Sequence, residues 1–182
     1  MDNLDQAAAV RPGEELDLGK IEAYLRDVLP GVDGPVAVEQ FPKGHSNLTY
    51  LVRAGSRDLV LRRPPFGTKA RGAHDMTREY RILNALKDVF PYVPRPLALC
   101  EDPAVLGAPF YVMERLRGVI PRRELPAALA ADPAAVRRLF ERFVEVMAEL
   151  HGLDFEALGL ADLGRPSGYA RRQVEGWSER YR

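Results

Sequence analysis

The sequence has little of several residue types, and each shortage excludes a class of protein. Of its 182 residues one is cysteine and three are histidine, which excludes an internal disulfide and a zinc cluster built on several thiolates. No apolar run approaches the roughly 20 residues that a membrane helix needs, and the first residues lack the basic-then-apolar pattern of a signal peptide. We therefore expect a cytoplasmic protein that has no membrane partner.

The charges are balanced, which argues against nucleic acid as a partner. The chain has 26 lysine and arginine residues against 26 aspartate and glutamate residues, whereas a nucleic-acid-binding domain has a strongly basic surface. Only four of the basic residues are lysine, and together with the alanine-rich stretch 127–135 this indicates a GC-rich coding bias. With 46% hydrophobic residues the chain can bury a core, so it is not a wholly disordered protein.

The first two thirds of the chain alternate short apolar runs with turn residues, which predicts an antiparallel sheet. Residues 1–16 have no hydrophobic period and are predicted to be a mobile leader. Helices are expected over 17–29 and 75–86, and strands over 36–41, 48–53, 59–63, 97–100 and 110–115.

Beyond Gly118 the apolar spacing becomes helical. Asp132-Pro133 starts a long helix that ends at His151, and its apolar stripe predicts a broad buried face. A last helix is expected over 169–182, where Trp177 and Tyr181 would be partly exposed and favour self-association. These changes predict three parts: the leader, a lobe over 17–118 and the start of a helical lobe over 119–182.

A carboxylate on an otherwise apolar helix face is the first candidate functional residue. Glu79 shares a face with Ile82, Leu83 and Leu86 of the predicted helix. A charge there is costly unless a partner neutralises it, and Arg62 at the end of a predicted strand is the candidate partner. In the alternative interpretation Glu79 lies at the edge of the stripe and is merely solvated.

The connection between the first two strands contains small and polar residues that can surround a phosphate group. Gly44 allows close backbone approach, and His45, Ser46, Asn47 and Thr49 offer polar groups to phosphate oxygens. The same composition is typical of an ordinary turn.

The strand over 110–115 continues into a charged linker. A segment between two lobes leaves backbone groups unpaired, and these could pair with the polar edge of a planar ring. In the alternative interpretation the segment is a strand followed by a surface loop.

Taken in order, these features resemble protein-kinase-like folds. The closer resemblance is to the aminoglycoside phosphotransferase family, in particular to the kinase-like domains fused to acyl-CoA dehydrogenases. It is carried by Gly44-His45-Ser46-Asn47-Leu48-Thr49-Tyr50, Leu59-Val60-Leu61-Arg62-Arg63-Pro64-Pro65, Ala73-His74-Asp75-Met76 with Arg78-Glu79-Tyr80, and Tyr111-Val112-Met113-Glu114. The implied fold is α+β: an N-terminal lobe with a five-stranded antiparallel sheet and one inserted helix, then the first helices of an incomplete C-terminal helical lobe.

The resemblance implies ATP and magnesium (Mg2+) as cofactors. The residues implied in cofactor binding are Gly44, His45, Ser46, Asn47, Thr49, Val60, Arg62, Glu79, Met113, Glu114 and Leu116. The loop would cover the phosphates, Arg62 would contact them while paired to Glu79, and Glu114 and Leu116 would offer a backbone carbonyl and amide to adenine. Two departures stand out, since Lys43 replaces a common glycine and Arg62 replaces the usual lysine, whose compact charge holds phosphate differently.

The family also has groups that this sequence lacks. A His-Gly-Asp-type loop and a later magnesium-binding aspartate normally follow the long helix, and no such string occurs here. The string His151-Gly152-Leu153-Asp154 looks similar, but it falls where the long helix is predicted to end. We therefore expect no catalytic residue and no metal ligand in this chain, which would be the inactive first part of a longer protein.

The sequence thus favours the nucleotide-binding lobe of an ATP-dependent phosphotransferase that transfers the γ-phosphate to a hydroxyl of a small molecule. An aminoglycoside and a hydroxyacyl thioester are both open as acceptors. The alternative is a truncated, non-catalytic module that binds nucleotide or a protein partner. A third hypothesis, nucleic-acid binding by the arginine-rich last helix, conflicts with the balanced charge.

Overall fold

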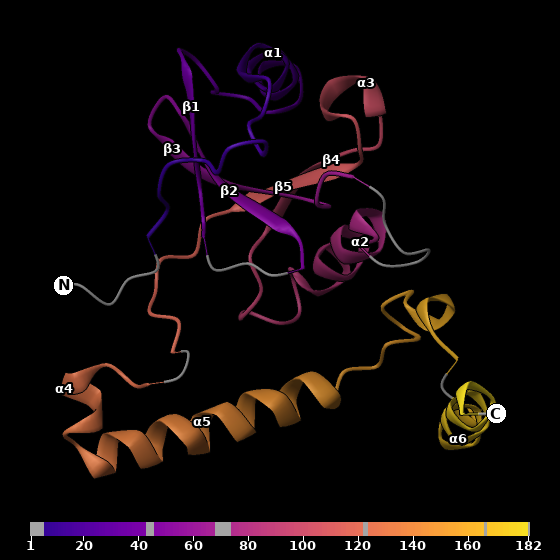
Figure 1. The fold of residues 1–182 in the computed structure, drawn as a ribbon. Coiled ribbons are helices and arrows are strands. Elements are labelled where there is room, and N and C mark those ends of the chain that lie inside the picture. The colour runs from indigo at the N-terminus through magenta and orange to yellow at the C-terminus, as the bar shows by residue number, and fades with distance from the viewer. Residues whose placement is uncertain (1–5, 43–45, 68–73, 122–123, 166, 182) are drawn as a thin grey trace.

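A five-stranded sheet with helices on both of its faces forms the first part of the molecule, and a group of helices forms the second (Figure 1). The structure is a computed structural model that describes residues 6–42, 46–67, 74–121, 124–165 and 167–181. The strands are β1 (Val36–Gln40), β2 (Leu48–Ala54), β3 (Arg57–Arg63), β4 (Pro96–Cys100) and β5 (Phe110–Glu114). All neighbouring strands are antiparallel in the order β1-β2-β3-β5-β4, which confirms the predicted sheet.

The predicted helices also form, with boundaries within two residues of those expected. They are α1 (Leu18–Val28), α2 (Met76–Leu86), α5 (Pro133–His151) and α6 (Tyr169–Arg180). Asp17, Asp75 and Asp132 cap the first three, because each carboxylate accepts a hydrogen bond from a backbone amide of the first turn. The short helices α3 (Pro103–Leu106), α4 (Ala127–Ala130) and η1 (Ala161–Leu163) were not predicted, since three or four residues show no helical period.

The β2–β3 hairpin depends on one glycine. Gly55 has a φ of 59°, and a Cβ atom at this position would lie 2.8 Å from the backbone oxygen of Asp33. Both the left-handed conformation and the lack of space require glycine. This turn fixes the register in which Thr49 faces Arg62 across the two strands.

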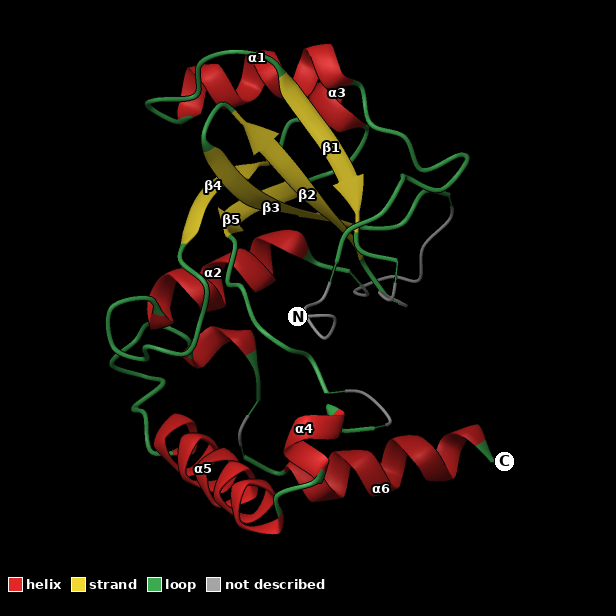
Figure 2. Ribbon diagram, turned by 90° about the vertical axis from the view of Figure 1, so that its left-hand side faces the viewer, coloured by secondary structure: helices red, strands yellow, loops and turns green. Residues whose placement is uncertain are grey.

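The apolar core lies between one face of the sheet and helices α1 and α3, which both views place on the same side of it (Figures 1 and 2). Ile21 and Leu25 of α1 are fully buried against Tyr50, Leu61 and Phe110 of the sheet. Burial raises the pKa of Tyr50 to about 12, and the hydroxyl of this residue donates a hydrogen bond to the backbone oxygen of Glu14.

The opposite face of the sheet is the one that α2 approaches (Figure 2). Side chains alternate between the two faces of a strand, so residues that are paired across strands share a face. Two cross-strand rows on this face are Thr49–Arg62–Tyr111 and Leu51–Val60–Met113. The sequence thus separates an apolar face for the core from a mixed face that carries the candidate site.

The structure differs from the expected leader over the part of it that is described, residues 6–16. The backbones of Ala8 and Gln40 exchange two hydrogen bonds of 2.8 Å, and the Gln40 side chain accepts from the Arg11 amide and donates to Glu14. Leu16 is buried in the core. Mainly polar contacts hold this segment at the edge of the sheet. Its sequence therefore has no hydrophobic period from which an ordered structure could be predicted.

The helical part corrects a second prediction. Residues of the α5 stripe were expected to be buried, but Phe140 and Phe143 are 57% and 58% exposed. The stripe exists, and no described element covers it. Contact with the sheet-bearing part is made at other points: Arg81 of α2 binds both carboxylate oxygens of Asp162 at 2.6 and 2.7 Å, and Arg142 donates to the Tyr92 hydroxyl.

Within the described ranges, no helix has the length and apolarity to cross a membrane.

Candidate functional site

An ion pair joins β3 to α2 on the mixed face of the sheet. The Arg62 Nε atom donates to Glu79 Oε2 at 2.8 Å, and the two side chains are 31% and 32% exposed. The sequence predicted this partner for Glu79 because Arg62 lies at the end of its strand. The alternative is also partly right, since Glu79 lies at the edge of the apolar stripe and keeps some contact with solvent.

Three further side chains hold this pair from different segments. Asn47 Nδ2 donates to Glu79 Oε1 at 2.7 Å, and the Tyr111 hydroxyl donates to Glu79 Oε2 at 3.0 Å. Thr49 Oγ1 lies 3.5 Å from Arg62 Nη1. Both oxygens of the Glu79 carboxylate are therefore occupied. Burial, and then the negative charge of Glu79, raise the pKa of Tyr111, which keeps its hydroxyl protonated as a donor.

Arg62 keeps part of its guanidinium available. Its Nε atom is used by Glu79 and its Nη1 atom points toward Thr49. Among the described residues its Nη2 atom has no hydrogen-bond partner in the fold. A guanidinium that is oriented by a carboxylate on one edge can present the other edge to an anion.

The structure brings together four of the residues implied by the resemblance, namely Asn47, Thr49, Arg62 and Glu79. Ser46 is exposed next to them. Gly44 and His45, together with Lys43, lie outside the described residues.

Val60 and Met113 lie further along the same face, opposite each other on β3 and β5. They belong to the row after that of Arg62, so they are about 7 Å from it along the strands. Val60 is buried and Met113 is partly buried. Together with Leu51 they form an apolar patch beside the ion pair.

The linker after β5 is fixed at its beginning. Glu114 is paired with Arg95, whose amide donates to the Glu114 carboxylate at 2.9 Å, while the Glu114 amide donates to the Arg95 oxygen at 2.9 Å. Leu116 is 58% exposed, and in the described part of the chain its amide has no backbone partner.

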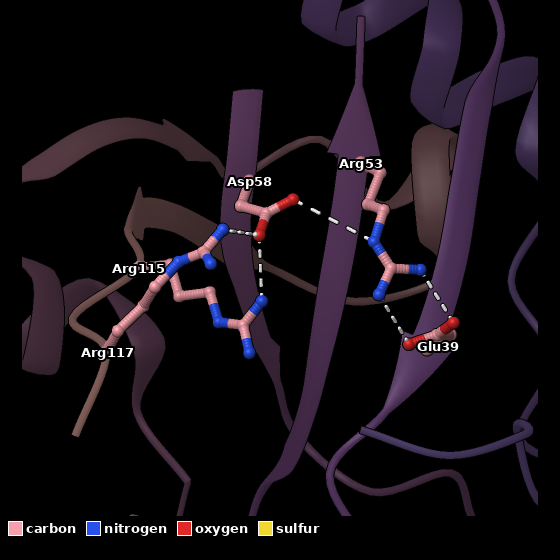
Figure 3. A network of polar contacts seen from close by, with 5 residues as sticks. All are labelled: Glu39, Arg53, Asp58, Arg115 and Arg117. Carbon is pink, nitrogen blue, oxygen red and sulfur yellow. Dashed lines mark hydrogen bonds and ion pairs between the residues drawn. The ribbon is translucent and has the colours of Figure 1, made fainter. Parts of the chain in front are cut away.

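A group of charged residues anchors the same linker to the sheet (Figure 3). Asp58 Oδ2 accepts from Arg115 Nη1 at 2.8 Å and from Arg117 Nη2 at 2.6 Å. Arg53, 3.8 Å from Asp58, also forms a two-bond pair with Glu39. Sequence reasoning missed this group, because Asp58 and Arg115 meet only through the pairing of β3 with β5.

The kinase-loop-like string at the end of α5 has an ordinary structural role. His151 is the last residue of α5 and Gly152 is its cap. Asp154 Oδ1 accepts from the backbone amides of Glu156 and Ala157, each at 3.0 Å. The carboxylate thus stabilises the following turn, in agreement with the prediction that this string is a helix terminus.

Comparison with known proteins establishes the class to which the protein belongs. The sequence profile described as "Phosphotransferase enzyme family" matches residues 37–182, so the chain belongs to this family. A solved structure from Ralstonia eutropha, provisionally named an aminoglycoside phosphotransferase, has a TM-score of 0.72 and 35% sequence identity; the match covers 92% of this chain and 47% of that chain. The fold is therefore kinase-like.

The chain is also similar to curated proteins that are named acyl-CoA dehydrogenase family members. The chain is 38% identical to acyl-CoA dehydrogenase family member 11 of Gallus gallus over 94% of this chain and 22% of that protein. It is 37% identical to acyl-CoA dehydrogenase family member 10 of Mus musculus over 89% of this chain and 15% of that protein. The chain thus spans less than a quarter of the length of these two relatives. These matches agree with the resemblance that the sequence motifs indicated.

Proposed function

We propose that this chain is the nucleotide-binding lobe of an ATP-dependent phosphotransferase that phosphorylates a hydroxyl group of a small molecule. The observation that carries the proposal is the Arg62–Glu79 ion pair, which is held by side chains from three further positions on the mixed face of the sheet. Membership of the phosphotransferase family supports it.

The arrangement suits a nucleotide in a definite direction. Arg62 would bind phosphate oxygens with its remaining N–H groups, and the patch of Leu51, Val60 and Met113 would contact the adenine ring. The Glu114 carbonyl and the Leu116 amide would meet the polar edge of the ring. Phosphates and base would thus lie along β3, with the phosphates toward its C-terminal end.

Magnesium fits this site only as an ion carried with the nucleotide. Within the described residues, no three histidine, cysteine, aspartate or glutamate side chains gather so that they could hold a metal ion. When bound, the ion would supply positive charge that neutralises the phosphate groups. The part of this chain is to orient the phosphates through Arg62.

A direct test is calorimetric titration of the folded chain with ATP, with and without magnesium, followed by an assay for phosphate release. We expect saturable binding in the micromolar to millimolar range, which is usual for enzyme substrates. Binding without turnover is the expected result for this chain, because the catalytic loop and the magnesium-binding aspartate of the family do not occur in its sequence. The alternative, a module that binds nucleotide but transfers no phosphate, would be favoured if the native gene product also bound ATP without turnover. Absence of ATP binding by a chain shown to be folded would contradict the proposal.

We place this activity in the cytoplasm. The single cysteine, Cys100, is buried and burial raises the pKa of its thiol. A chain that makes no internal disulfide is typical of a reducing compartment.

We also propose that the uncovered apolar faces of α5 and α6 cause the isolated chain to self-associate. Phe140 and Phe143 of α5 and Trp177 of α6 are each more than half exposed, and large exposed apolar patches commonly mark contact surfaces. In sedimentation velocity experiments the chain is expected to form dimers or larger species. The double variant Phe140→Glu/Phe143→Glu should shift it to monomers.

Arg138→Glu is the matched control for the self-association experiment. It changes charge on the same helix at a side chain that is 67% exposed and lies outside the apolar stripe. It should leave the sedimentation pattern unchanged. A wild-type chain that is monodisperse and monomeric would contradict this proposal.

A further inference from the structure

The side chain of Asn47 is engaged at both ends, although the sequence suggested it as a phosphate ligand. It is 5% exposed, its Nδ2 atom is 2.7 Å from Glu79 Oε1, and its Oδ1 atom is 2.6 Å from His74 Nδ1. An amide with one donor and one acceptor already used in buried contacts has little left to offer a phosphate. Its position instead joins the end of the β1–β2 connection to α2.

The charge of Glu79 dictates the direction of this hydrogen-bond chain. A carboxylate can only accept, so the NH2 group of Asn47 must face Glu79 and its carbonyl oxygen must face His74. The His74 Nδ1 atom must then carry a proton. The chain runs from His74 through Asn47 to Glu79 and, beyond it, to Arg62.

The backbone of His74 has an unusual conformation directly before α2. His74 has a φ of 65°, a left-handed conformation that non-glycine residues rarely adopt. It directly precedes Asp75, the N-cap of α2. The strained residue thus lies where α2 begins, and its ring reaches the amide that holds Glu79 within the same helix.

We propose that Asn47 is a positioning residue of the Arg62–Glu79 pair, and that His74 fixes the direction of its amide. The inference rests on the proposed function, in which that pair orients the phosphates of ATP. Asn47 fixes one carboxylate oxygen of Glu79, the other holds Arg62, and the guanidinium is thereby aimed. The position of Asn47, directly before β2, would then be coupled to the orientation of Arg62.

The hydrogen-bond chain can be tested in the absence of ligand by nitrogen-15 NMR of the histidine rings. The chain has three histidines, so assignment by a His74→Gln variant is practical. We expect the neutral ring of His74 to be protonated at Nδ1, and the Asn47→Ala variant to lose this preference. A neutral ring protonated at Nε2 in the wild-type chain would overturn the proposed direction of the amide.

The positioning role can be tested by ATP affinity. Asn47→Ala should weaken binding about five- to tenfold, less than a direct contact would, because Asn47 does not touch ATP and acts only through its coupling to Glu79 and Arg62. Asn47→Asp has nearly the same shape but places a second carboxylate against Glu79, so it should weaken binding more than Asn47→Ala. In the Glu79→Gln background the same Asn47→Asp change should cost little, because the amide can donate to the new carboxylate. A role of Asn47 that does not act through Glu79 would give the same loss in both backgrounds.

Thr77→Val is a matched control on α2. Thr77 Oγ1 donates to Glu101 Oε1 at 3.0 Å and lies outside the chain of contacts around Glu79, so the ATP affinity of this variant should be unchanged. If the wild-type chain binds ATP and Asn47→Ala binds it equally well, the positioning role is wrong and the proposed function stands. If the folded wild-type chain binds no ATP, the proposed function is wrong, and the positioning role falls with it.

Discussion

Replacing Arg62 with alanine is expected to weaken ATP binding about 10- to 100-fold. A hydrogen bond between charged groups contributes about 1.5–3 kcal/mol, and a tenfold change in affinity corresponds to about 1.4 kcal/mol. Arg62 is prepared for such a bond, because Glu79 holds its Nε atom at 2.8 Å and Tyr111 and Asn47 hold Glu79. The dissociation constant of ATP, measured by calorimetry, checks the prediction.

Arg57→Ala is the control for this experiment. Arg57 belongs to the same strand, but its Nη1 atom donates to the Pro30 oxygen at 3.1 Å, away from the site. This substitution also removes one positive charge, so it separates a local contact from a general effect of charge. It should leave ATP affinity within about twofold, since it lies outside the proposed contacts.

A double-mutant cycle tests whether the two charges act together. Glu79→Ala should also weaken ATP binding, because an unheld guanidinium must be ordered on binding. The double variant Arg62→Ala/Glu79→Ala should then lose less than the sum of the single variants. Strict additivity would show that the ion pair does not prepare Arg62 for the nucleotide.

Phe110→Ala is expected to lower the free energy of unfolding by about 3–5 kcal/mol, as truncation of a buried phenylalanine usually does. Phe110 is fully buried in the core, and its ring contacts Tyr24 of α1 edge to face with centroids 5.1 Å apart. The substitution leaves a cavity between the sheet and α1. Urea unfolding followed by circular dichroism measures the effect.

Val144→Ala is the matched control for the core. It also truncates an apolar side chain, but Val144 is 64% exposed on α5, so its effect should stay within about 0.5 kcal/mol. A loss below about 1 kcal/mol for Phe110→Ala would be far under the range for buried aromatic residues. Such a result would mean that the sheet does not pack on α1 as described.

The elements that the sequence predicted well depend on local chemistry. Asp132 comes directly before the apolar period of α5 and caps this helix where the sequence predicted its start. Turn residues between the predicted strands 48–53 and 59–63 indicated an antiparallel pair, and Gly55 lies in the turn that joins them. The Arg62–Glu79 pair could also be predicted from the sequence. A carboxylate on an apolar helix face requires a partner, and Arg62 lay at the end of a neighbouring predicted strand. Periodicity was enough to bring these two charges together.

Other parts of the site depend on contacts between distant residues. Asn47 bonds His74 and Glu79, which are 27 and 32 residues away in the sequence, and nothing local to Asn47 indicates either partner. The composition of the segment around Asn47 suggested a phosphate-binding turn, whereas the side-chain amide of Asn47 forms hydrogen bonds within the fold. Tyr111 was likewise expected only as part of an apolar strand. The apolar stripe of α5 was read correctly as a pattern, but a pattern does not say what covers it.

The ion pairs that attach the linker after β5 to Asp58 affect how the sheet and the helices are connected. The Arg115–Asp58 pair is well shielded, with side chains 17% and 22% exposed, whereas Arg117 is 69% exposed and adds little. The backbone is therefore fastened to the sheet as far as Arg115, whereas an added Cβ at Gly118 would meet no atom within 4 Å. The groups proposed to meet adenine, Glu114 and Leu116, flank this anchor, so the base would keep its position relative to the sheet in any rearrangement of the helices.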